Sequence, residues 1–310
     1  MSVASPPAIR VVGLRKSYGS LVAVNGIDFE VAVGEVFGLL GPNGAGKTTT
    51  VEILEGYRRP DVGTVSVLGC DPIRDAVRLR PRMGVMLQEG GLYPGLTPRE
   101  VLDLFSNYYE DPEDPDDLLT VVGLESSQQT PVRRLSGGSR QKLSLAAALM
   151  GKPEILFLDE PTGGMDPHAR ATTWELLRER SARGTTVVLT THAMDEAEQL
   201  CDRVAIMAGG RLAAIGTPHE LTQQVDVAEL WFATAPGLDS STLARVMETS
   251  PDAVSEERPG EYLVRVPATP ARIAALANFL AERDLTLRAL HAGRRSLEDV
   301  FLQITAEEPA

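Results

Sequence analysis

The chain has 310 residues, enough for one large domain and a smaller one, and its 43% hydrophobic content is ordinary for a globular protein. Its 30 basic and 43 acidic residues give a net charge of −13, which would repel a nucleic-acid backbone unless basic residues formed a stripe, and the sequence has no such stripe. The two cysteines are too few for a disulfide framework and suit a reducing cytosol.

The first segment, MSVASPPAIR, lacks the basic and apolar regions of a secretion signal. No later apolar run approaches the length needed to span a bilayer. We therefore expect any role at a membrane to come through a partner.

Residues 27–56, IDFEVAVGEVFGLLGPNGAGKTTTVEILEG, predict a strand, a glycine loop and then a helix that begins near Lys47. The loop fits the phosphate-binding pattern G-x-x-x-x-G-K-[ST]. Its backbone N–H groups can surround a β-phosphate, Lys47 can reach the β- and γ-phosphates, and the Thr48 hydroxyl can bind Mg²⁺. The residues expected to bind the nucleotide are Gly41, Pro42, Asn43, Gly44, Ala45, Gly46, Lys47, Thr48 and Thr49.

Residues 135–143, LSGGSRQKL, place a serine and two glycines where a helix should begin. One interpretation is a turn with a serine cap. The other is an anion site in which Ser136, Gly137 and Gly138 offer backbone N–H groups to a phosphate. The segment alone leaves both interpretations open.

Two apolar strands are predicted downstream, at residues 155–158 and 187–190. The first ends in Asp159 and Glu160, which are suited to hold Mg²⁺ and to polarise the water that attacks a γ-phosphate. His192 follows the second strand and precedes a helix. If the two strands are neighbours, this histidine could reach a γ-phosphate.

The loop, LSGGS, FLDE and the later histidine occur in the order of the ATP-binding-cassette (ABC) ATPases, and residues 8–220 resemble that family. The resemblance implies an α/β fold of the P-loop NTPase class, with a RecA-like core, an antiparallel β subdomain and a helical subdomain. It also implies that Gln88, in MLQEGGLYP, contacts Mg²⁺ and water and senses a membrane partner. Tyr18, in LRKSYGS, resembles the aromatic residue that stacks on adenine.

In this family the serine and glycines bind the γ-phosphate held by the opposite subunit. The resemblance therefore implies two cassettes arranged head to tail around two ATP molecules, with GGMDP (163–167) across the contact. A homodimer is the simpler arrangement, and pairing with a sister cassette is the other. Ser139 replaces the common glutamine and GGMDP replaces SGLDP, so we expect altered affinity between subunits rather than lost hydrolysis.

Residues 95–125 predict helices broken by a Pro/Asp-rich turn at 111–117. The resemblance makes this the helical subdomain, which receives a helix from a membrane subunit near Gln88. A groove exposing Leu92, Tyr93 or Leu96 would suit that contact.

The motifs end near residue 222, which divides the chain into a nucleotide-binding domain (8–222) and an accessory α+β domain (223–310) with a dimerising or regulatory role. Its ending, RRSLEDVFLQIT, resembles the tail of drug-resistance (daunorubicin-resistance type) and polysaccharide exporter ATPases. An amphipathic helix with Leu297, Val300, Phe301 and Ile304 packed inward explains the same pattern without export.

These observations predict an ATP-hydrolysing, Mg²⁺-dependent energy-coupling subunit on the inner face of the cell membrane. Its partner would be a separate permease that exports drug-like, lipid or polysaccharide cargo, and nucleic acid is not expected to bind. A soluble ABC ATPase acting in translation or DNA repair is the alternative, which the single cassette and the acidic charge disfavour. A small-molecule kinase would leave LSGG unexplained.

Overall fold

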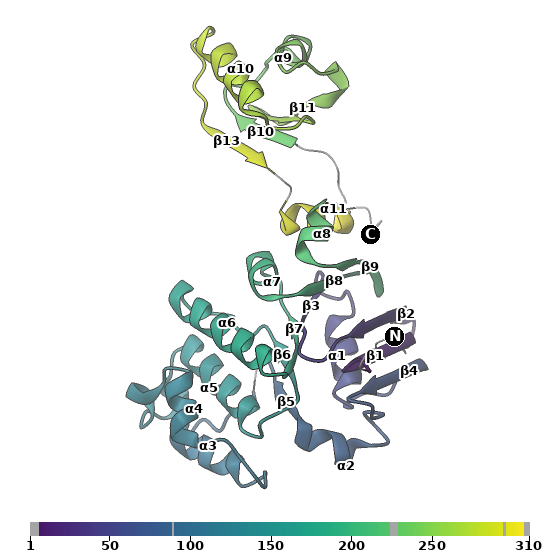
Figure 1. The fold of residues 1–310 in the computed structure, drawn as a ribbon, viewed down its shortest axis with the longest axis vertical. Helices are drawn as coiled ribbons and strands as arrows, with labels where there is room; N and C mark the ends of the chain where they lie inside the picture. Colours follow the sequence, from purple (N-terminus) through teal and green to yellow (C-terminus); the bar gives the residue numbers. More distant parts are fainter. Residues whose placement is uncertain (1–5, 89, 224–228, 294–295, 307–310) are drawn as a thin grey trace, which may run out of the picture. The chain divides into compact units, whose positions relative to one another are not determined.

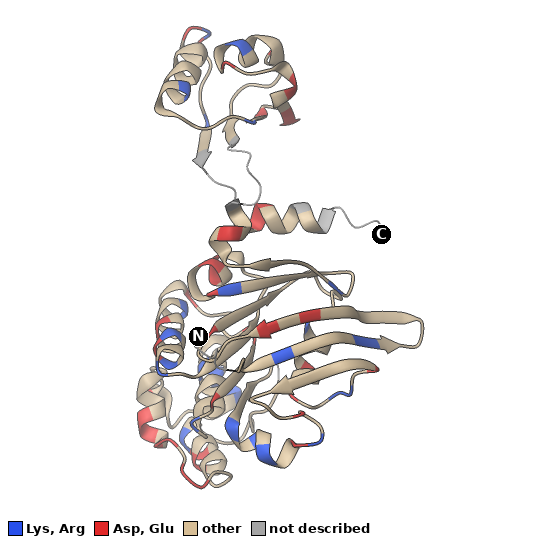
Figure 2. Ribbon diagram, turned by 45° about the vertical axis from the view of Figure 1, so that its right-hand side comes forward, with Lys and Arg blue, Asp and Glu red and all other residues tan. Residues whose placement is uncertain are grey.

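The computed structural model describes residues 6–88, 90–223, 229–293 and 296–306. Its contacts divide the chain into two compact units, Met1–Pro218 with Gln303–Ala310, and His219–Leu302. Each unit has its own core and is described by itself (Figure 1). Basic and acidic residues are interspersed along the elements of both units (Figure 2).

The first unit is built on a six-stranded sheet in the order β5-β6-β7-β3-β8-β9. Its strands are β3 (Val36–Leu40), β5 (Met83–Met86), β6 (Ile155–Asp159), β7 (Thr186–Thr190), β8 (Arg203–Ala208) and β9 (Arg211–Gly216). All neighbouring strands in this order are parallel except β8 and β9. The predicted strands at 155–158 and 187–190 are therefore confirmed as neighbours. Because β7 lies between β6 and β3, the loops that follow these three strands meet at one edge of the sheet.

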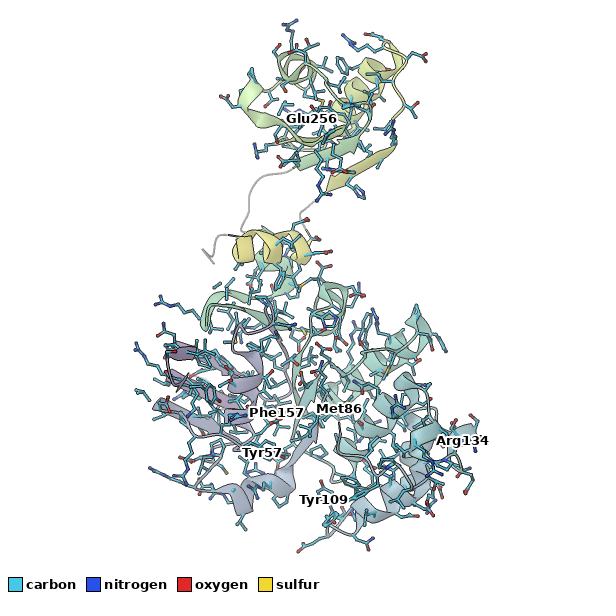
Figure 3. The ribbon with its side chains drawn as sticks, turned by 180° about the vertical axis from the view of Figure 1, so that it is seen from behind. Tyr57, Met86, Tyr109, Arg134, Phe157 and Glu256 are labelled. Carbon is cyan, nitrogen blue, oxygen red and sulfur yellow. The ribbon has the colours of Figure 1, made fainter. Side chains whose placement is uncertain are left out.

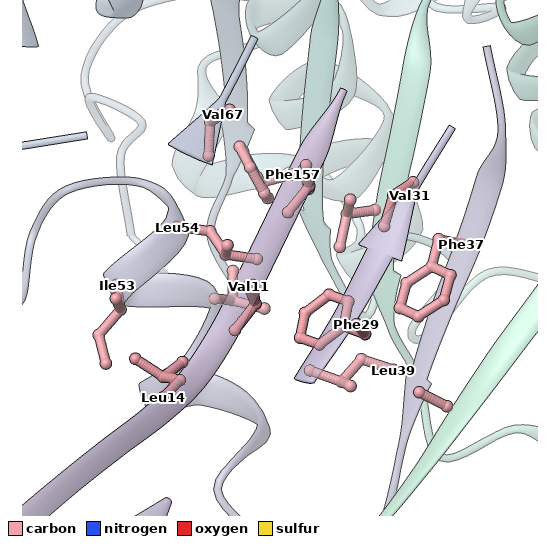
Figure 4. Packing of buried hydrophobic residues seen from close by; sticks show 14 of the residues in the cluster. Val11, Leu14, Phe29, Val31, Phe37, Leu39, Ile53, Leu54, Val67 and Phe157 are labelled. Atoms are coloured by element: carbon pink, nitrogen blue, oxygen red, sulfur yellow. The ribbon is translucent and has the colours of Figure 1, made fainter. Parts of the chain in front are cut away.

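A smaller antiparallel sheet faces the first, with the order β2-β1-β4. Its strands and the helix beside it are β1 (Ile9–Tyr18), β2 (Leu21–Val31), β4 (Val62–Val67) and α1 (Lys47–Leu54). Ile53 of α1 and Phe157 of β6 belong to the same buried cluster as residues of the small sheet (Figures 3 and 4). The rings of Phe29 and Phe37 stack across the two sheets, 5.5 Å apart. This packing fixes the phosphate-loop helix between the sheets.

Helices cover the large sheet and form a separate helical layer. They are α2 (Ala76–Leu79), α3 (Pro98–Ser106), α4 (Pro115–Val121), α5 (Gly137–Leu149), α6 (Pro167–Ala182) and α7 (Met194–Leu200). Helices α3, α4 and α5 contact one another, and α5 also packs on β5 and β6. The expected RecA-like core with an antiparallel β subdomain and a helical subdomain is confirmed.

The connection between α3 and α4 covers residues 107–114, so the predicted turn at 111–117 ends three residues too late. Pro115 begins α4, because proline fits the first helical position, where no N–H donor is needed. The Asp114 carboxylate caps the helix by accepting hydrogen bonds from the N–H groups of Asp116 (2.8 Å) and Asp117 (3.3 Å). Two of the acidic residues that indicated a turn therefore belong to a helix.

The second unit is a small α+β domain, as predicted. Its main elements are β10 (Glu229–Ala233), α9 (Ser240–Val246), β11 (Val254–Arg258), β12 (Glu261–Val264), α10 (Pro270–Ala281) and β13 (Ala289–Gly293). The antiparallel sheet order β11-β12-β10-β13 is that of a βαββαβ ferredoxin-like unit. Phe232 and Tyr262 stack in its core, which also contains Leu243 and Phe279 from the two helices.

Two further helices include the points in the sequence where the chain passes from one unit to the other. Helix α8 spans Pro218–Gln223, and α11 spans Leu297–Ala306, where the amphipathic tail was predicted to be helical. In α11, Leu297 and Val300 are buried. Phe301 and Ile304 are partly exposed, so two of the four residues expected to point inward do so only in part.

Candidate functional site

The phosphate loop joins β3 to α1 and is closely approached by other parts of the backbone. A Cβ atom at Gly46, where φ is +100°, would lie 2.2 Å from the Ala23 carbonyl oxygen. A Cβ atom at Gly41 would lie 2.5 Å from the Met207 carbonyl oxygen. Gly44, with φ of +83°, has open space around it. Both motif glycines are therefore required by packing, and Gly44 between them leaves room beside the loop.

Lys47 begins α1 and turns back over its own loop. Its Nζ donates hydrogen bonds to the carbonyl oxygens of Gly41 (2.6 Å) and Pro42 (3.0 Å). Burial lowers the pKa of Lys47, while the carboxylates of Asp159 and Glu160 raise it. The ammonium group therefore lies between the phosphate loop and the carboxylates of Asp159 and Glu160. Phosphate oxygens could replace the carbonyl oxygens of Gly41 and Pro42 as its hydrogen-bond partners.

Glu160 brings three of the predicted residues together. Its Oε1 lies 2.8 Å from His192 Nδ1, and its Oε2 accepts a hydrogen bond of 3.1 Å from Gln88 Nε2. Its backbone has φ of +48°, in the left-handed region that residues other than glycine rarely adopt, and its N–H donates to the Thr190 carbonyl oxygen. The carboxylate is therefore presented by an unusual backbone turn and fixed by side chains from two other segments.

Asp159 ends β6, where the Thr190 hydroxyl of the adjacent strand donates a hydrogen bond to its Oδ1. A neighbouring acid, Glu55, lies at the end of α1 and is 6% exposed. Burial raises the pKa of Glu55 to about 8, with the charges of Glu52 and Asp159 adding to the shift. Asp159 thus contributes to a negative field around the loop, which favours a cation there.

The oxygen donors of Thr48, Gln88 and Asp159 are of the hard type that Mg²⁺ prefers. Among the described residues no group of three or more His, Cys, Asp or Glu side chains could hold a metal ion. A magnesium ion at this edge would therefore take other ligands from water and phosphate oxygens, as is usual for Mg²⁺ beside nucleotides. The residues present fit such an ion.

The LSGGS segment adopts the capped helix start of the first interpretation. Ser136 is the N-cap of α5, and its hydroxyl accepts a hydrogen bond from the Ser139 N–H (3.1 Å). A Cβ atom at Gly138 would lie 3.3 Å from the Gly164 carbonyl oxygen, so GGMDP packs against this helix start within one chain. A Cβ atom at Gly137 would contact nothing within 4 Å.

A cavity of about 790 Å³ connects this helix start to the acidic edge of the sheet. Its lining includes Gln88, Gly137, Glu160, Gly163 and His192. The other predicted nucleotide residues lie elsewhere, since neither Lys47 nor Tyr18 is part of this lining. Tyr18 ends β1, and its side chain is partly exposed.

Comparison with known proteins agrees with this geometry. The ABC transporter family model matches residues 24–163. A Nod factor export ATP-binding protein I from Ralstonia nicotianae is 42% identical, covering 99% of this chain and 96% of that protein. Its counterpart from Rhizobium leguminosarum bv. viciae is 39% identical, covering 98% and 96%.

This chain belongs to the ATP-binding proteins of ABC transporters.

Solved structures share the fold of this cassette. An ATP-binding subunit of an ABC transporter superposes with a TM-score of 0.65 at 29% identity, covering 71% of this chain and 93% of that one. The cbiO1 protein of Clostridium perfringens, part of the cbiONQ transporter complex, gives 0.63 at 29% identity, covering 70% and 91%. The expected ABC ATPase is therefore confirmed, and its relatives are export proteins, as the tail resemblance suggested. The cassette binds and hydrolyses ATP to power transport.

None of the described helices combines the length and the apolar character needed to cross a membrane.

Two residues of the cassette that the sequence did not single out hold the site together. Gln141 of α5 donates a hydrogen bond of 2.9 Å to the Glu160 carbonyl oxygen. Glu196 of α7 is 1% exposed and accepts hydrogen bonds from the Thr162 hydroxyl (2.7 Å) and from Trp174 Nε1 (3.1 Å). Gln141 lies about one helical turn beyond Gly137, a spacing that could have indicated a shared face. Glu196 carried no comparable signal, because it sits among other acids in MDEAEQL.

Proposed function

We propose that this cassette is the ATPase of an exporter whose permease is a separate membrane protein. The observation that carries the proposal is the placement of Glu160, held between Gln88 and His192 beside the lysine of the phosphate loop. Residues 8–222 are the nucleotide-binding domain, and residues 223–310 are an accessory domain. The residues proposed to contact ATP are Tyr18, Gly41, Pro42, Asn43, Gly44, Ala45, Gly46, Lys47, Thr48 and Thr49.

Each group at the sheet edge has a separate role in this proposal. Lys47 binds the β- and γ-phosphates, and Glu160 accepts the proton of the attacking water as general base. His192 orients Glu160 and contacts the γ-phosphate. Thr48, Gln88 and Asp159 would hold Mg²⁺, which neutralises phosphate charge when bound.

The serine and glycines at the start of α5 complete the site of a second cassette. Gly137 lines the cavity, none of the phosphate-loop residues does, and one chain carries one copy of each motif. Two copies related by a two-fold axis would form two ATP sites, and each site would take the phosphate loop from one copy and the start of α5 from the other. We therefore propose a homodimer that closes on two ATP molecules.

Gly137→Asp tests the shared site. The added side chain has open space within its own chain, so the fold should persist, but its charge would face a phosphate. We expect ATP binding to the single chain to survive and hydrolysis to fall more than about tenfold. Equilibrium binding and steady-state ATPase assays measure the two effects, with Gly137→Ala as the uncharged control. Equal loss of binding and hydrolysis would mean that the segment has only a structural role.

The membrane partner is proposed to dock in a second groove of the same unit. This groove has a volume of about 310 Å³ and is largely apolar and aromatic. Its lining includes Tyr57, Met83, Met86, Leu92, Phe105 and Tyr109, of which Figure 3 labels three. Of the residues predicted to border such a groove, Leu92 lines it, while Tyr93 is exposed outside it. An amphipathic helix of a permease fits a groove of this kind.

Export follows from the relatives, which are named for export of Nod factor, and from the tail resemblance. The cargo proposed is drug-like, lipid or polysaccharide, and the cassette lies on the inner face of the cell membrane. Nucleic acid is not a proposed partner, because the charge is −13 and basic and acidic residues are interspersed over the described elements (Figure 2).

Capture from native membranes tests the proposed partner. Tyr57 is 62% exposed in the groove, so Tyr57→Asp should fold but place an unpaired charge against an apolar helix. With ATP present, we expect the wild-type chain to retain a polytopic membrane protein and Tyr57→Asp to lose most of it. Val77→Asp, at a residue that is 92% exposed and outside the groove, is the matched control. Recovery of ribosomal or repair proteins instead would favour the soluble alternative.

A further inference from the structure

Two basic side chains lie over the ring of Tyr18. Lys16 Nζ is 5.5 Å and Arg58 Cζ is 5.4 Å from the ring centroid. The tyrosine is the last residue of β1, and 39% of its surface is exposed. Arg58 belongs to the segment between α1 and β4, so the contact joins two distant parts of the sequence.

Each of the two cations is fixed by an acid. Lys16 Nζ pairs with Asp61 Oδ1 at 2.8 Å, and the other oxygen of Asp61 accepts a hydrogen bond from the Ser17 N–H at 2.7 Å. Arg58 donates from Nε and from one terminal nitrogen to the two carboxylate oxygens of Glu52. Glu52 lies on α1, five residues after Lys47. The tyrosine is therefore bordered by charged groups that are themselves held in place.

This arrangement matters for a ring that must stack on a base. An exposed tyrosine at a strand end would lose rotamer freedom when a base binds, and that loss reduces affinity. A planar guanidinium over an aromatic ring restricts the ring beforehand, and its two-point contact with a carboxylate restricts the guanidinium. The ion pair with Glu52 connects this restriction to the helix that begins at the phosphate loop.

We propose that Arg58, held by Glu52, is a positioning residue that keeps Tyr18 ready to stack on the base of ATP. The inference rests on the proposed role of Tyr18 in adenine binding. Arg58 acts only through the ring and leaves the phosphate half of the site unaffected. Its removal should therefore change recognition of the base without changing recognition of the triphosphate.

The test compares ATP with inorganic tripolyphosphate, which has no base, on the full chain. Arg58→Ala should weaken ATP binding about two- to fivefold and leave tripolyphosphate binding unchanged. In steady-state assays the KM for ATP should rise while kcat stays the same, the pattern of lost uniform binding. Arg59→Ala removes the same charge one residue further along and should leave the KM unchanged.

A double-mutant cycle separates this inference from the proposal on which it rests. Tyr18→Ala should weaken ATP binding about tenfold, and Arg58→Ala should have no further effect in that background. Tighter or unchanged ATP binding in Arg58→Ala alone would overturn the positioning role, as would an equal effect of that change with and without Tyr18. If Tyr18→Ala leaves ATP binding unchanged, the adenine assignment of Tyr18 fails, and the inference about Arg58 fails with it.

Discussion

Replacing Glu160 with glutamine is expected to slow ATP turnover by about two to four orders of magnitude while ATP still binds. Glutamine has the shape of glutamate but cannot accept a proton from water. Binding depends on the phosphate loop, which the change does not touch. Gln88 and His192, which contact the Glu160 carboxylate at 3.1 and 2.8 Å, retain a polar partner of the same size.

The matched control lies at the other end of the same strand. Glu154 precedes β6 and pairs with Arg82 at the surface, so Glu154→Gln removes an acid without touching the site. Steady-state ATPase assays should separate the two variants. Because hydrolysis resets the closed state, Glu160→Gln with ATP should also sediment as a dimer. A monomer under these conditions would contradict the proposed homodimer, and wild-type turnover would contradict the role of Glu160.

Lys47→Ala is expected to abolish ATP binding at concentrations that saturate the wild-type chain. Lys47 Nζ is a half-buried cation at the centre of the loop, and removing one partner of such a charged contact costs about 2 to 5 kcal/mol. Hydrolysis should be lost together with binding, unlike in Glu160→Gln. Equilibrium binding of ATP measures the difference directly.

Lys152→Ala is the control for Lys47→Ala, because it removes a lysine charge outside the candidate site. Lys152 pairs with Asp111 at the surface, 2.7 Å away, and that pair lies outside the cavity that contains Glu160. Its removal should leave ATP affinity unchanged. Hydrolysis at the wild-type rate in Lys47→Ala would show that the loop does not bind the reacting phosphates.

The sequence predicted the phosphate loop and the two strand ends of the candidate site, because their signals are local. Glycine spacing around Lys47 and the apolar runs before Asp159 and His192 fix a loop and two strand ends through short-range geometry. These features depend little on which distant segments happen to meet.

Features that depend on distant contacts were not predicted. The spacing of Gln141 from Gly137 indicates a shared helix face, but nothing in the sequence indicates that Gln141 reaches the Glu160 carbonyl oxygen. Nor does the sequence indicate that Arg58 covers Tyr18, because both contacts come from tertiary packing. The turn at 111–117 was predicted to end three residues too late, since aspartate and proline favour helix starts as well as turns. The second interpretation of Ser136 stays a prediction, because capping α5 and binding an anion use the same backbone end.

Folding and chemistry favour different residues at position 160. Its φ of +48° would suit glycine or asparagine, and an ordinary side chain there costs about 1 kcal/mol or more. A chain selected for thermal stability alone would therefore be expected to lose the glutamate at this position. Stabilised versions of this cassette obtained by screening for heat resistance should be sequenced at position 160 before their activity is interpreted, because the most stable backbone there is one without a general base.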